Sequence, residues 1–391
     1  MLPSGRAATI TPVSGDEWIS AAAAEVAARA ERELEALVAV SSPSGDAHAA
    51  EEAAAVVTAL LPTEAEIERP ACSTPDYAPD LIARVEGRGE RRLVLVGHVD
   101  TVISHSAHRP LERIGDRLVG PGTIDMKGGV ALSLGVMRAL AAVVDSFAEL
   151  TLLLVTDEEW RSRPFAHVER FAGYDGCLCF EGGQLTGEGH DGVVVRRKAA
   201  GTLHATAHGA AAHSGSAPDS GRNALLALAA CAAEVAALHD PAGSARLTAV
   251  PTILRSGEAF NVVPDSGELY CDLRADRLDA FEPVLAALPR EIGGVRIEAG
   301  MARRWPAMDS RAATEGLLED AAKRLGRPVV GVERGGASDA SHLAETIALT
   351  VDGLGPIGGG AHTDQEYALA PSLESRAEVA LAVAAALLRI D

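Results

Sequence analysis

The apolar positions in the first half of the chain alternate between helical and strand spacing. Residues 18–40, 51–61 and 126–147 place them at the spacing of amphipathic helices. Short, continuously apolar runs predict buried strands at 81–85, 93–96, 150–155 and 176–180. This order is typical of an α/β domain with a mostly parallel sheet flanked by helices. The first ~15 residues lack the pattern, and we expect them to form a loosely attached tail.

The pattern changes near residue 193 and changes back near residue 300. Between these points it predicts strands at 193–198, 203–208, 247–254, 268–273 and 295–299, and helices at 223–238 and 278–288. The first pattern then resumes, with apolar runs at 329–332, 347–351 and 373–389. We therefore expect a catalytic domain made of residues 1–196 and 304–391, interrupted by an inserted α+β domain of residues 197–303.

The composition favours small-molecule chemistry. The chain has 391 residues with a formal charge of −20, which disfavours a nucleic acid or an anionic membrane as partner. No apolar run approaches the roughly 18 residues that a membrane helix needs. The 5 scattered cysteines predict no disulfide framework, which favours the cytoplasm. Cys177 and Cys179 alternate along an apolar run, so we expect them to be buried strand residues.

His98 and Asp100 directly follow one of the predicted strands. Side chains two residues apart in a strand point to the same side, so the pair can act together. His98 could bind a metal ion while Asp100 accepts the other ring N–H and fixes the tautomer. A surface loop explains this short pattern about as well when it is taken alone.

Further acids and one histidine stand at the ends of other predicted elements. Asp125 lies between glycines at a strand-to-helix junction, and Glu158 and Glu159 close the strand at 150–155. Adjacent acids at a buried strand end repel one another unless protons or a cation neutralise them. Together, these positions supply the imidazole and carboxylate ligands of a zinc, cobalt or manganese site: His98, Asp125, Glu159, Glu181 and His362.

Several motifs follow one another along the chain: GHVDTV, GPGTIDMKGG, TDEE, FEGG, AAHSG, FNVVPDS, DLR, GGASDA and GGGAHTDQEY. As a set they resemble the metallopeptidase superfamily of bacterial glutamate carboxypeptidase, aminoacylase, acetylornithine deacetylase and succinyl-diaminopimelate desuccinylase. The resemblance runs from about Trp18 to the C-terminus. It implies a zinc-exopeptidase-like catalytic domain with an inserted lid, which commonly carries the contact of a homodimer.

The resemblance also implies a role for each candidate ligand. Asp125 would bridge two divalent metal ions, of which zinc is the first choice and cobalt or manganese the alternatives. Glu159 and His362 would complete the coordination of one metal ion, and His98 and Glu181 that of the other.

Two catalytic roles and one backbone feature follow from the same resemblance. Glu158 would be the general base that takes a proton from the attacking water, and Asp100 would orient His98. The peptide bond between Asp125 and Met126 would be cis.

The expected lid supplies three further candidates. His213 resembles the histidine that reaches across the dimer to the tetrahedral oxyanion, although its local context also fits an ordinary loop histidine. Asn261 and Arg274 match polar residues around the substrate carboxylate or the scissile carbonyl, but Arg274 could instead belong to a surface ion pair. The chain departs from the family at Trp160, where a small residue is usual, and this side chain could reshape the pocket.

Three functions are compatible with these residues. The first is a carboxypeptidase of the glutamate type, which would cleave an amide bond next to a free carboxylate in a small peptide. The second is an N-acyl-amino-acid deacylase on the same scaffold. The third is a non-catalytic binding protein, which is the weakest because Glu158 and all the candidate ligands are present. We favour the carboxypeptidase, because three segments resemble that branch most: the Arg-Arg-Lys hinge at 196–198 and the lid segments Ala-Ala-His-Ser-Gly and Pro-Asp-Ser-Gly-Arg-Asn.

Overall fold

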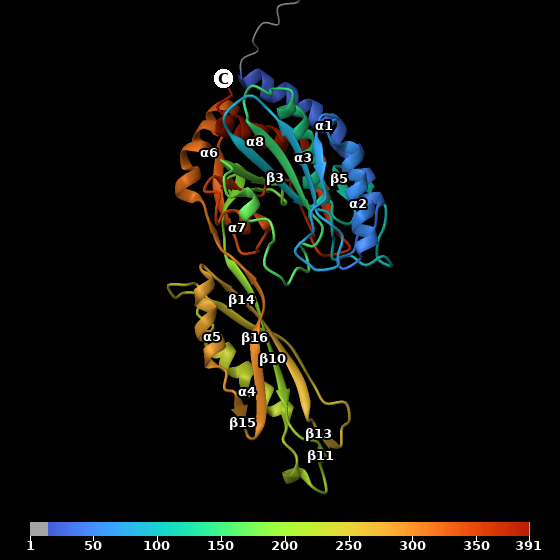
Figure 1. Ribbon diagram of the computed structural model, residues 1–391, viewed down its shortest axis with the longest axis vertical. Coiled ribbons are helices and arrows are strands. Elements are labelled where there is room, and N and C mark those ends of the chain that lie inside the picture. The colour runs from blue at the N-terminus through green and yellow to red at the C-terminus, as the bar shows by residue number, and fades with distance from the viewer. Residues whose placement is uncertain (1–14, 391) are drawn as a thin grey trace, which may run out of the picture.

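The computed structural model describes residues 15–390, so the tail expected at the N-terminus lies almost wholly outside the described residues. The chain forms a layered α/β body, with a narrower β-rich part extending from it (Figure 1). No helix within the described range is both long and apolar enough to cross a membrane.

The α/β body is built on a 6-stranded sheet with the order β1-β2-β6-β3-β7-β19. Its strands are β1 (Glu66–Glu68), β2 (Leu81–Glu86), β3 (Arg92–His98), β6 (Glu149–Val155), β7 (Gly176–Cys179) and β19 (Thr350–Val351). β6, β3, β7 and β19 are parallel neighbours, whereas β1 and β2 form an antiparallel edge. The expected α/β class with a mostly parallel sheet is therefore confirmed.

Alternation along the strands buries both faces of this sheet. In β3, Leu93 and Leu95 belong to one apolar cluster, and Val94 and Val96 belong to another on the opposite face. The first cluster includes the long helices α1 (Gly15–Ala39), α3 (Lys127–Ala141) and α8 (Ser372–Leu388). The helix expected at 126–147 is shorter than predicted, because α3 ends at Ala141 and the chain then turns back to β6.

The remaining elements of this body surround the sheet. The helices are α2 (Ala47–Leu60), α6 (Arg311–Leu325) and α7 (Asp339–Leu343), and α7 packs on the second face. One small sheet contains β8 (Gln184–Leu185), β9 (Asp191–Arg197), β17 (Met308–Asp309) and β18 (Val329–Arg334). Another contains β4 (Glu112–Ile114), β5 (Arg117–Val119), β20 (Gly358–Gly359) and β21 (Tyr367–Leu369).

The pairing of β9 differs from what the sequence pattern led us to expect. We expected a strand at 193–198 within the inserted region, but β9 pairs in parallel with β18 and antiparallel with β17, both of which follow that region in the chain. The sequence shows that a strand is present, but two of its pairing partners, β17 and β18, are more than a hundred residues away, and only β8 is local.

The narrower part has its own 5-stranded antiparallel sheet with the order β12-β14-β10-β16-β15. Its strands are β10 (Ala199–His208), β12 (Thr248–Ser256), β14 (Ser266–Ala275), β15 (Glu291–Ile292) and β16 (Val295–Trp305). One face packs against α4 (Ala224–Ala237) and α5 (Glu282–Ala287) in a separate apolar cluster. At the far end, β11 (Ala212–His213) pairs with β13 (Val262–Val263).

Candidate metal centre

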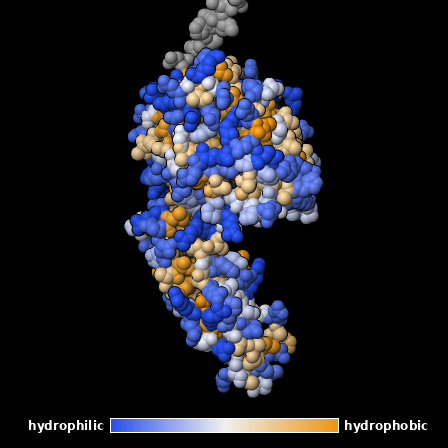
Figure 2. Space-filling view, in the orientation of Figure 1, coloured by the Kyte–Doolittle hydropathy of each residue, from blue (hydrophilic) through white to orange (hydrophobic). Residues whose placement is uncertain are grey.

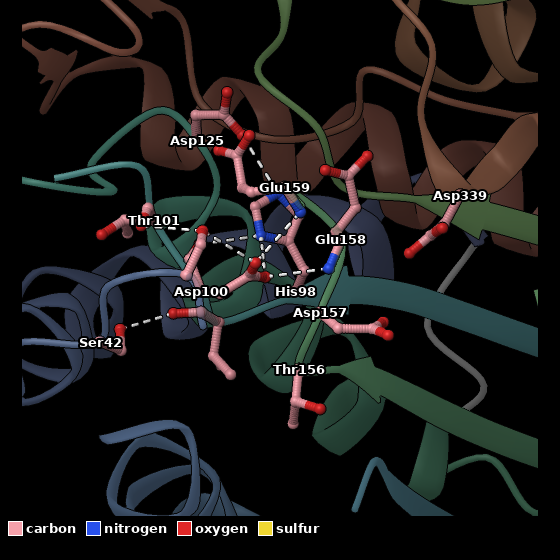
Figure 3. A network of polar contacts seen from close by, with 12 residues as sticks. Ser42, His98, Asp100, Thr101, Asp125, Thr156, Asp157, Glu158, Glu159 and Asp339 are labelled. Carbon is pink, nitrogen blue, oxygen red and sulfur yellow. Dashed lines mark hydrogen bonds and ion pairs between the residues drawn. The ribbon is translucent and has the colours of Figure 1, made fainter. Parts of the chain in front are cut away.

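The candidate metal ligands lie together at one edge of the central sheet. β3 ends at His98, while Glu159 and Glu181 follow the ends of β6 and β7. Because these strands are parallel neighbours, their carboxyl ends meet at the same edge. Asp125 lies just before α3, and His362 lies in the loop between β20 and β21. Figure 3 shows Asp125 and Glu159 beside the imidazole of His98.

The five side chains form two groups that share Asp125. One group is His98, Asp125 and Glu181, the other is Asp125, Glu159 and His362, and the ligand atoms of each group lie within 4.8 Å of one another. Nε2 of His98 lies 3.1 Å from Oδ1 of Asp125, and Nε2 of His362 lies 3.0 Å from Oδ2. Asp125 thus offers one carboxylate oxygen to each group, as a bridging ligand would.

This set of donors fits divalent metal ions. Imidazole nitrogens combined with carboxylate oxygens are ligands that zinc, cobalt and manganese accept. Oε1 of Glu159 is buried and makes no hydrogen bond within residues 15–390, although Nε2 of His362 lies 3.2 Å away. A buried carboxylate oxygen in this position is costly unless a cation neutralises it.

Burial and mutual contact shift the protonation of these groups. Burial raises the pKa of Glu158 and of Glu159, and it raises the pKa of Glu181 to about 8. Contact with the carboxylates of Asp125 and Glu159 raises the pKa of His362 to about 10. Burial opposes the ionisation of Asp125, but hydrogen bonds from the two histidines hold its pKa below the usual range. Bound cations would relieve this crowding of buried acids.

Asp100 connects the histidine at the end of β3 to the acids at the end of β6. Nδ1 of His98 lies 3.3 Å from Oδ1 of Asp100. The same carboxylate accepts the backbone N–H groups of Glu158 at 3.2 Å and Glu159 at 3.1 Å (Figure 3). It also accepts the Ser44 hydroxyl at 3.2 Å. Asp100 is therefore placed to orient both the imidazole and the adjacent acidic segment.

The sequence interpretation missed Glu366, which lies below the loop that carries Asp125. Its buried carboxylate accepts the backbone N–H groups of Gly122 and Ile124 at 2.8 Å and of Asp125 at 2.9 Å. Burial raises the pKa of Glu366 to about 7. Its position in GGGAHTDQEY, shortly after His362, was the available signal. The peptide bond between Asp125 and Met126 is cis, as the family resemblance implies.

A cavity of about 380 Å³ opens onto these groups. Its lining includes four acids (Asp125, Glu158, Glu159 and Glu181), His362, and four arginines (Arg197, Arg274, Arg303 and Arg334). A larger cavity of about 880 Å³ between α6 and β18 contains none of the candidate ligands in its lining. The smaller cavity is therefore where the chemistry implied by these residues would occur.

The lid candidates lie in two different places. His213 is in β11 and Asn261 is just before β13, so both are at the far tip of the narrow part and outside the cavity (Figure 1). The backbone N–H of Ser214 donates to the carbonyl oxygen of Asn261 at 3.0 Å, which joins the two segments. Arg274 does line the cavity, and it makes an ion pair with Asp272.

Trp160, at which the chain departs from the family pattern, directly follows the candidate ligand Glu159. Its side chain is 39% exposed and packs edge-on against Tyr77, with ring centroids 5.1 Å apart. Trp160 is not part of the cavity lining, so the cavity is not narrowed by it directly.

Comparison with protein families and curated proteins gives consistent matches. Residues 94–386 match peptidase family M20/M25/M40. Carboxypeptidase G2 of Pseudomonas sp. (strain RS-16) is 29% identical over 306 residues, covering 74% of this chain and 72% of that protein. Succinyl-diaminopimelate desuccinylase of Gluconobacter oxydans (strain 621H) is 27% identical over 333 residues, covering 78% of this chain and 83% of that protein.

Solved structures share the fold at lower sequence identity. Aminopeptidase PepT from Bacillus cereus ATCC 10987 gives a TM-score of 0.72 at 20% identity, covering 92% of this chain and 98% of that one. The M20 family metallo-carboxypeptidase Sso-CP2 from Sulfolobus solfataricus gives 0.71 at 16% identity, covering 91% and 98%. The family match extends over most of the chain and confirms the resemblance found in the motifs. The chain therefore belongs to peptidase family M20/M25/M40, and it is a metal-dependent hydrolase of that family, whose members bind divalent metal ions.

Proposed function

We propose that the chain hydrolyses an amide bond next to a free carboxylate in a small peptide-like substrate, as a carboxypeptidase of the glutamate type. The observation that carries this proposal is the arrangement of two ligand groups around Asp125 at the base of an arginine-lined cavity, with Glu158 beside them. The similarity to carboxypeptidase G2 supports the choice of a carboxypeptidase.

Two divalent metal ions, with zinc as the first choice and cobalt or manganese as alternatives, would be held by the two groups. One ion would bind to His98 and Glu181, the other to Glu159 and His362, and Asp125 would bind both. Bound there, such ions polarise a scissile carbonyl and lower the pKa of a water molecule.

Glu158 is the residue that we assign to proton transfer. Glu158 and Glu159 lie in the turn after β6 and both line the cavity, but only Glu159 belongs to a candidate ligand group. The Glu158 carboxyl group makes no hydrogen bond or ion pair within residues 15–390, whereas its backbone N–H is fixed by Asp100. It is therefore free to take a proton from the attacking water and then to deliver one to the leaving amine.

We assign residues 197–303 to a lid and dimerisation domain, inserted between the two parts of the catalytic domain (1–196 and 304–391). Support comes from the separate sheet and apolar cluster of this region. The boundary after residue 196 falls next to the last residue of β9, and the boundary after residue 303 falls inside β16.

A homodimer would complete the site. His213 is exposed at the tip of the narrow part, far from the cavity of its own chain. Its proposed contact with the oxyanion therefore requires a second subunit. Seven of the twelve exposed large apolar side chains that the structure describes lie between residues 225 and 262. Figure 2 shows apolar surface over the narrow part and at its tip. Such a surface supports a dimer contact there.

Arg274 and Asn261 are assigned to the substrate carboxylate or the scissile carbonyl. In β14, Nε and Nη2 of Arg274 donate to the two carboxylate oxygens of Asp272, each at 3.0 Å, which holds the guanidinium flat and leaves Nη1 available. Asn261 shares the lid tip with His213, so we assign it, like His213, to the site of the partner subunit.

The alternative reaction is the removal of an acyl group from an amino acid. Similarity to succinyl-diaminopimelate desuccinylase favours this second candidate, because that enzyme's name describes such a reaction. A panel of dipeptides and N-acyl amino acids, assayed with added zinc, cobalt or manganese, separates the two. We expect hydrolysis of C-terminal peptide bonds. Cleavage of only the acyl amino acids supports the deacylase, and no hydrolysis of either class contradicts the proposal.

A cytoplasmic location stays part of this proposal. All five cysteines are free and buried, which agrees with a reducing compartment.

A further inference from the structure

The turn that follows β6 is closed on itself around Glu158. The backbone N–H of Arg161 donates to the carbonyl oxygen of Asp157 at 3.0 Å, and Nη1 of Arg161 donates to Oδ1 of the Asp157 side chain at 3.1 Å. Glu158 lies inside this turn, where Asp100 accepts its backbone N–H. The turn also contains Trp160, at which the chain departs from the family pattern. The position of the carboxylate that we assign to proton transfer therefore depends on how this turn is held.

Arg161 is itself held by two acids in the protein interior. Its side chain is fully buried, and besides Asp157 it contacts Asp339, the first residue of α7, through a hydrogen bond from Nη2 to Oδ1. Figure 3 shows the carboxylates of Asp157 and Asp339 near Glu158. Buried ion pairs contribute little net stability compared with apolar packing of the same volume. Stability alone therefore does not explain why a charged network lies beside Glu158.

Two buried aromatic rings fix the direction of the Arg161 guanidinium. Its Cζ lies 4.6 Å from the ring centroid of Phe165 and 4.6 Å from that of Trp305. A ring attracts a cation to its face, and a planar guanidinium can make this contact while its N–H groups reach two separate acids. A lysine could pair with one of the acids but could not reproduce the whole arrangement.

Trp305 connects Arg161 to the strand that enters from the narrow part. Trp305 is the last residue of β16, and Cζ of Arg303, from the same strand, lies 4.5 Å from its ring centroid. Arg303 has no acidic partner within residues 15–390, and its Nη2 donates to the backbone carbonyl of Glu158 at 3.4 Å. The two arginines thus contact the same indole, and both also contact the turn that carries Glu158.

We propose that Arg161 is a positioning residue for Glu158. It closes the turn through Asp157, joins it to α7 through Asp339, and orients through Trp305 the arginine of β16 that contacts the turn. This inference rests on the proposed function, since it concerns the residue assigned to proton transfer. A displacement of about 1 Å at a reacting group can lower a rate about 10²-fold, so even a small movement of this turn has a measurable effect.

Arg161→Lys tests the position of the turn without removing the buried charge. The acids keep a cation, so the variant should fold, but the fork of N–H groups and the contacts with the two rings are lost. We expect kcat to fall about tenfold to a hundredfold, with KM and metal content near those of the wild type. Arg163→Gln is the matched control, because Arg163 is exposed two residues further along the chain, and it should keep the wild-type kcat.

A double variant, Arg161→Met with Asp339→Asn, separates positioning from packing. It removes one charge of each sign and keeps the volume nearly constant, so the melting temperature should stay near that of the wild type. The kcat of the folded, metal-replete protein should nevertheless be low. A wild-type kcat in this variant or in Arg161→Lys overturns the inference. A loss of kcat that is accompanied in both variants by equal losses of metal content and melting temperature also overturns it.

Hydrogen exchange separates this inference from the proposed function. The backbone N–H groups of Glu158 and Glu159 both donate to Asp100, so their exchange with deuterium reports how firmly the turn is held. This exchange can be measured even if the wild type cleaves no amide, in which case the proposed reaction fails. We expect faster exchange of the two amides in Arg161→Lys than in the wild type and in Arg163→Gln. Equal exchange rates in the three proteins contradict the inference.

Discussion

The edge of the central sheet and the tip of the lid both carry residues that the sequence marks as functional, but they differ in how those residues are held. At the sheet edge, the side chain of His98 and the backbone of Glu158 are fixed by Asp100, and the loop of Asp125 is fixed by Glu366. At the lid tip, His213 is exposed and accepts hydrogen bonds only from nearby backbone N–H groups, at 3.1 and 3.2 Å.

This difference separates a preorganised site from an incomplete one. The sheet edge can position metal ions and water by itself, because all five candidate ligands come from one chain and lie together there. His213 does not line the 380 Å³ cavity, so its proposed role there depends on a surface supplied by another molecule. The predictions below test the two regions in turn.

The largest effect is expected at the sheet edge, from Glu158→Gln. The change removes proton transfer but no metal ligand, so kcat should fall about 10²–10⁴-fold with KM nearly unchanged. Metal content and melting temperature should stay near those of the wild type. A stable, metal-replete variant with near-normal kcat would refute the assignment of Glu158.

A smaller loss is expected at the lid tip, from His213→Ala. Removal of one oxyanion donor typically costs about 10²–10³-fold in kcat. If His213 acts in the partner's site, mixing this variant with Glu158→Gln should restore part of the activity, because a mixed dimer contains one site with both residues intact. The double variant, mixed with His213→Ala, is the control and should restore none. A mixture of the single variants that exchanges subunits and stays inactive contradicts the shared site.

Stability should also depend on the residue that holds the Asp125 loop. Glu366→Gln keeps the shape but replaces one of the two oxygens that accept the three backbone N–H groups with an NH₂ group, so unfolding should become easier by up to about 3 kcal/mol. Glu374→Gln, on the exposed side of α8, is the matched control and should change stability little. Equal denaturation midpoints for the two variants would show that Glu366 does not support the loop.

The smallest expected effect is a pH dependence of the free energy of unfolding, caused by the buried side chain of His342 in α7. Burial lowers the pKa of His342 to about 2, and its ring packs against Trp305 and Phe165. Below the unfolded-state pKa of about 6.5, the unfolded chain binds a proton that the folded chain does not, so stability falls as the pH falls. Between pH 7 and pH 5 this contribution is about 2 kcal/mol, and it should be absent in His342→Phe. Parallel stability curves for the two proteins would contradict it.

Much of the fold was predictable, because burial on both faces of the central sheet leaves continuous apolar runs such as that of β6. The clustering of three candidate ligands, His98, Glu159 and Glu181, was predictable for a related reason: they follow those runs, and the ends of parallel strands meet at one edge. The pairing of Arg274 with Asp272 could also have been predicted, since residues two apart in a strand share a face.

Other features depend on contacts between distant segments and leave no local pattern. β9 pairs with β18 across the whole inserted region, so its sheet could not be assigned from its own residues. The unpaired state of Arg303 depends on which acids the fold brings near it, and Arg304 beside it looks equivalent in the sequence. The sequence marks charged residues, but only the fold distinguishes those that have partners.

Metal titration of the purified protein tests the central claim, that two metal ions share Asp125. By mass spectrometry or calorimetry, the wild type should bind two zinc ions per chain, and Glu159→Gln and Glu181→Gln should each weaken one of them. Asp125→Ala should weaken both, because each ligand group loses the shared carboxylate. A wild type that binds a single ion, or an Asp125→Ala variant that still binds one ion with unchanged affinity, would contradict the account.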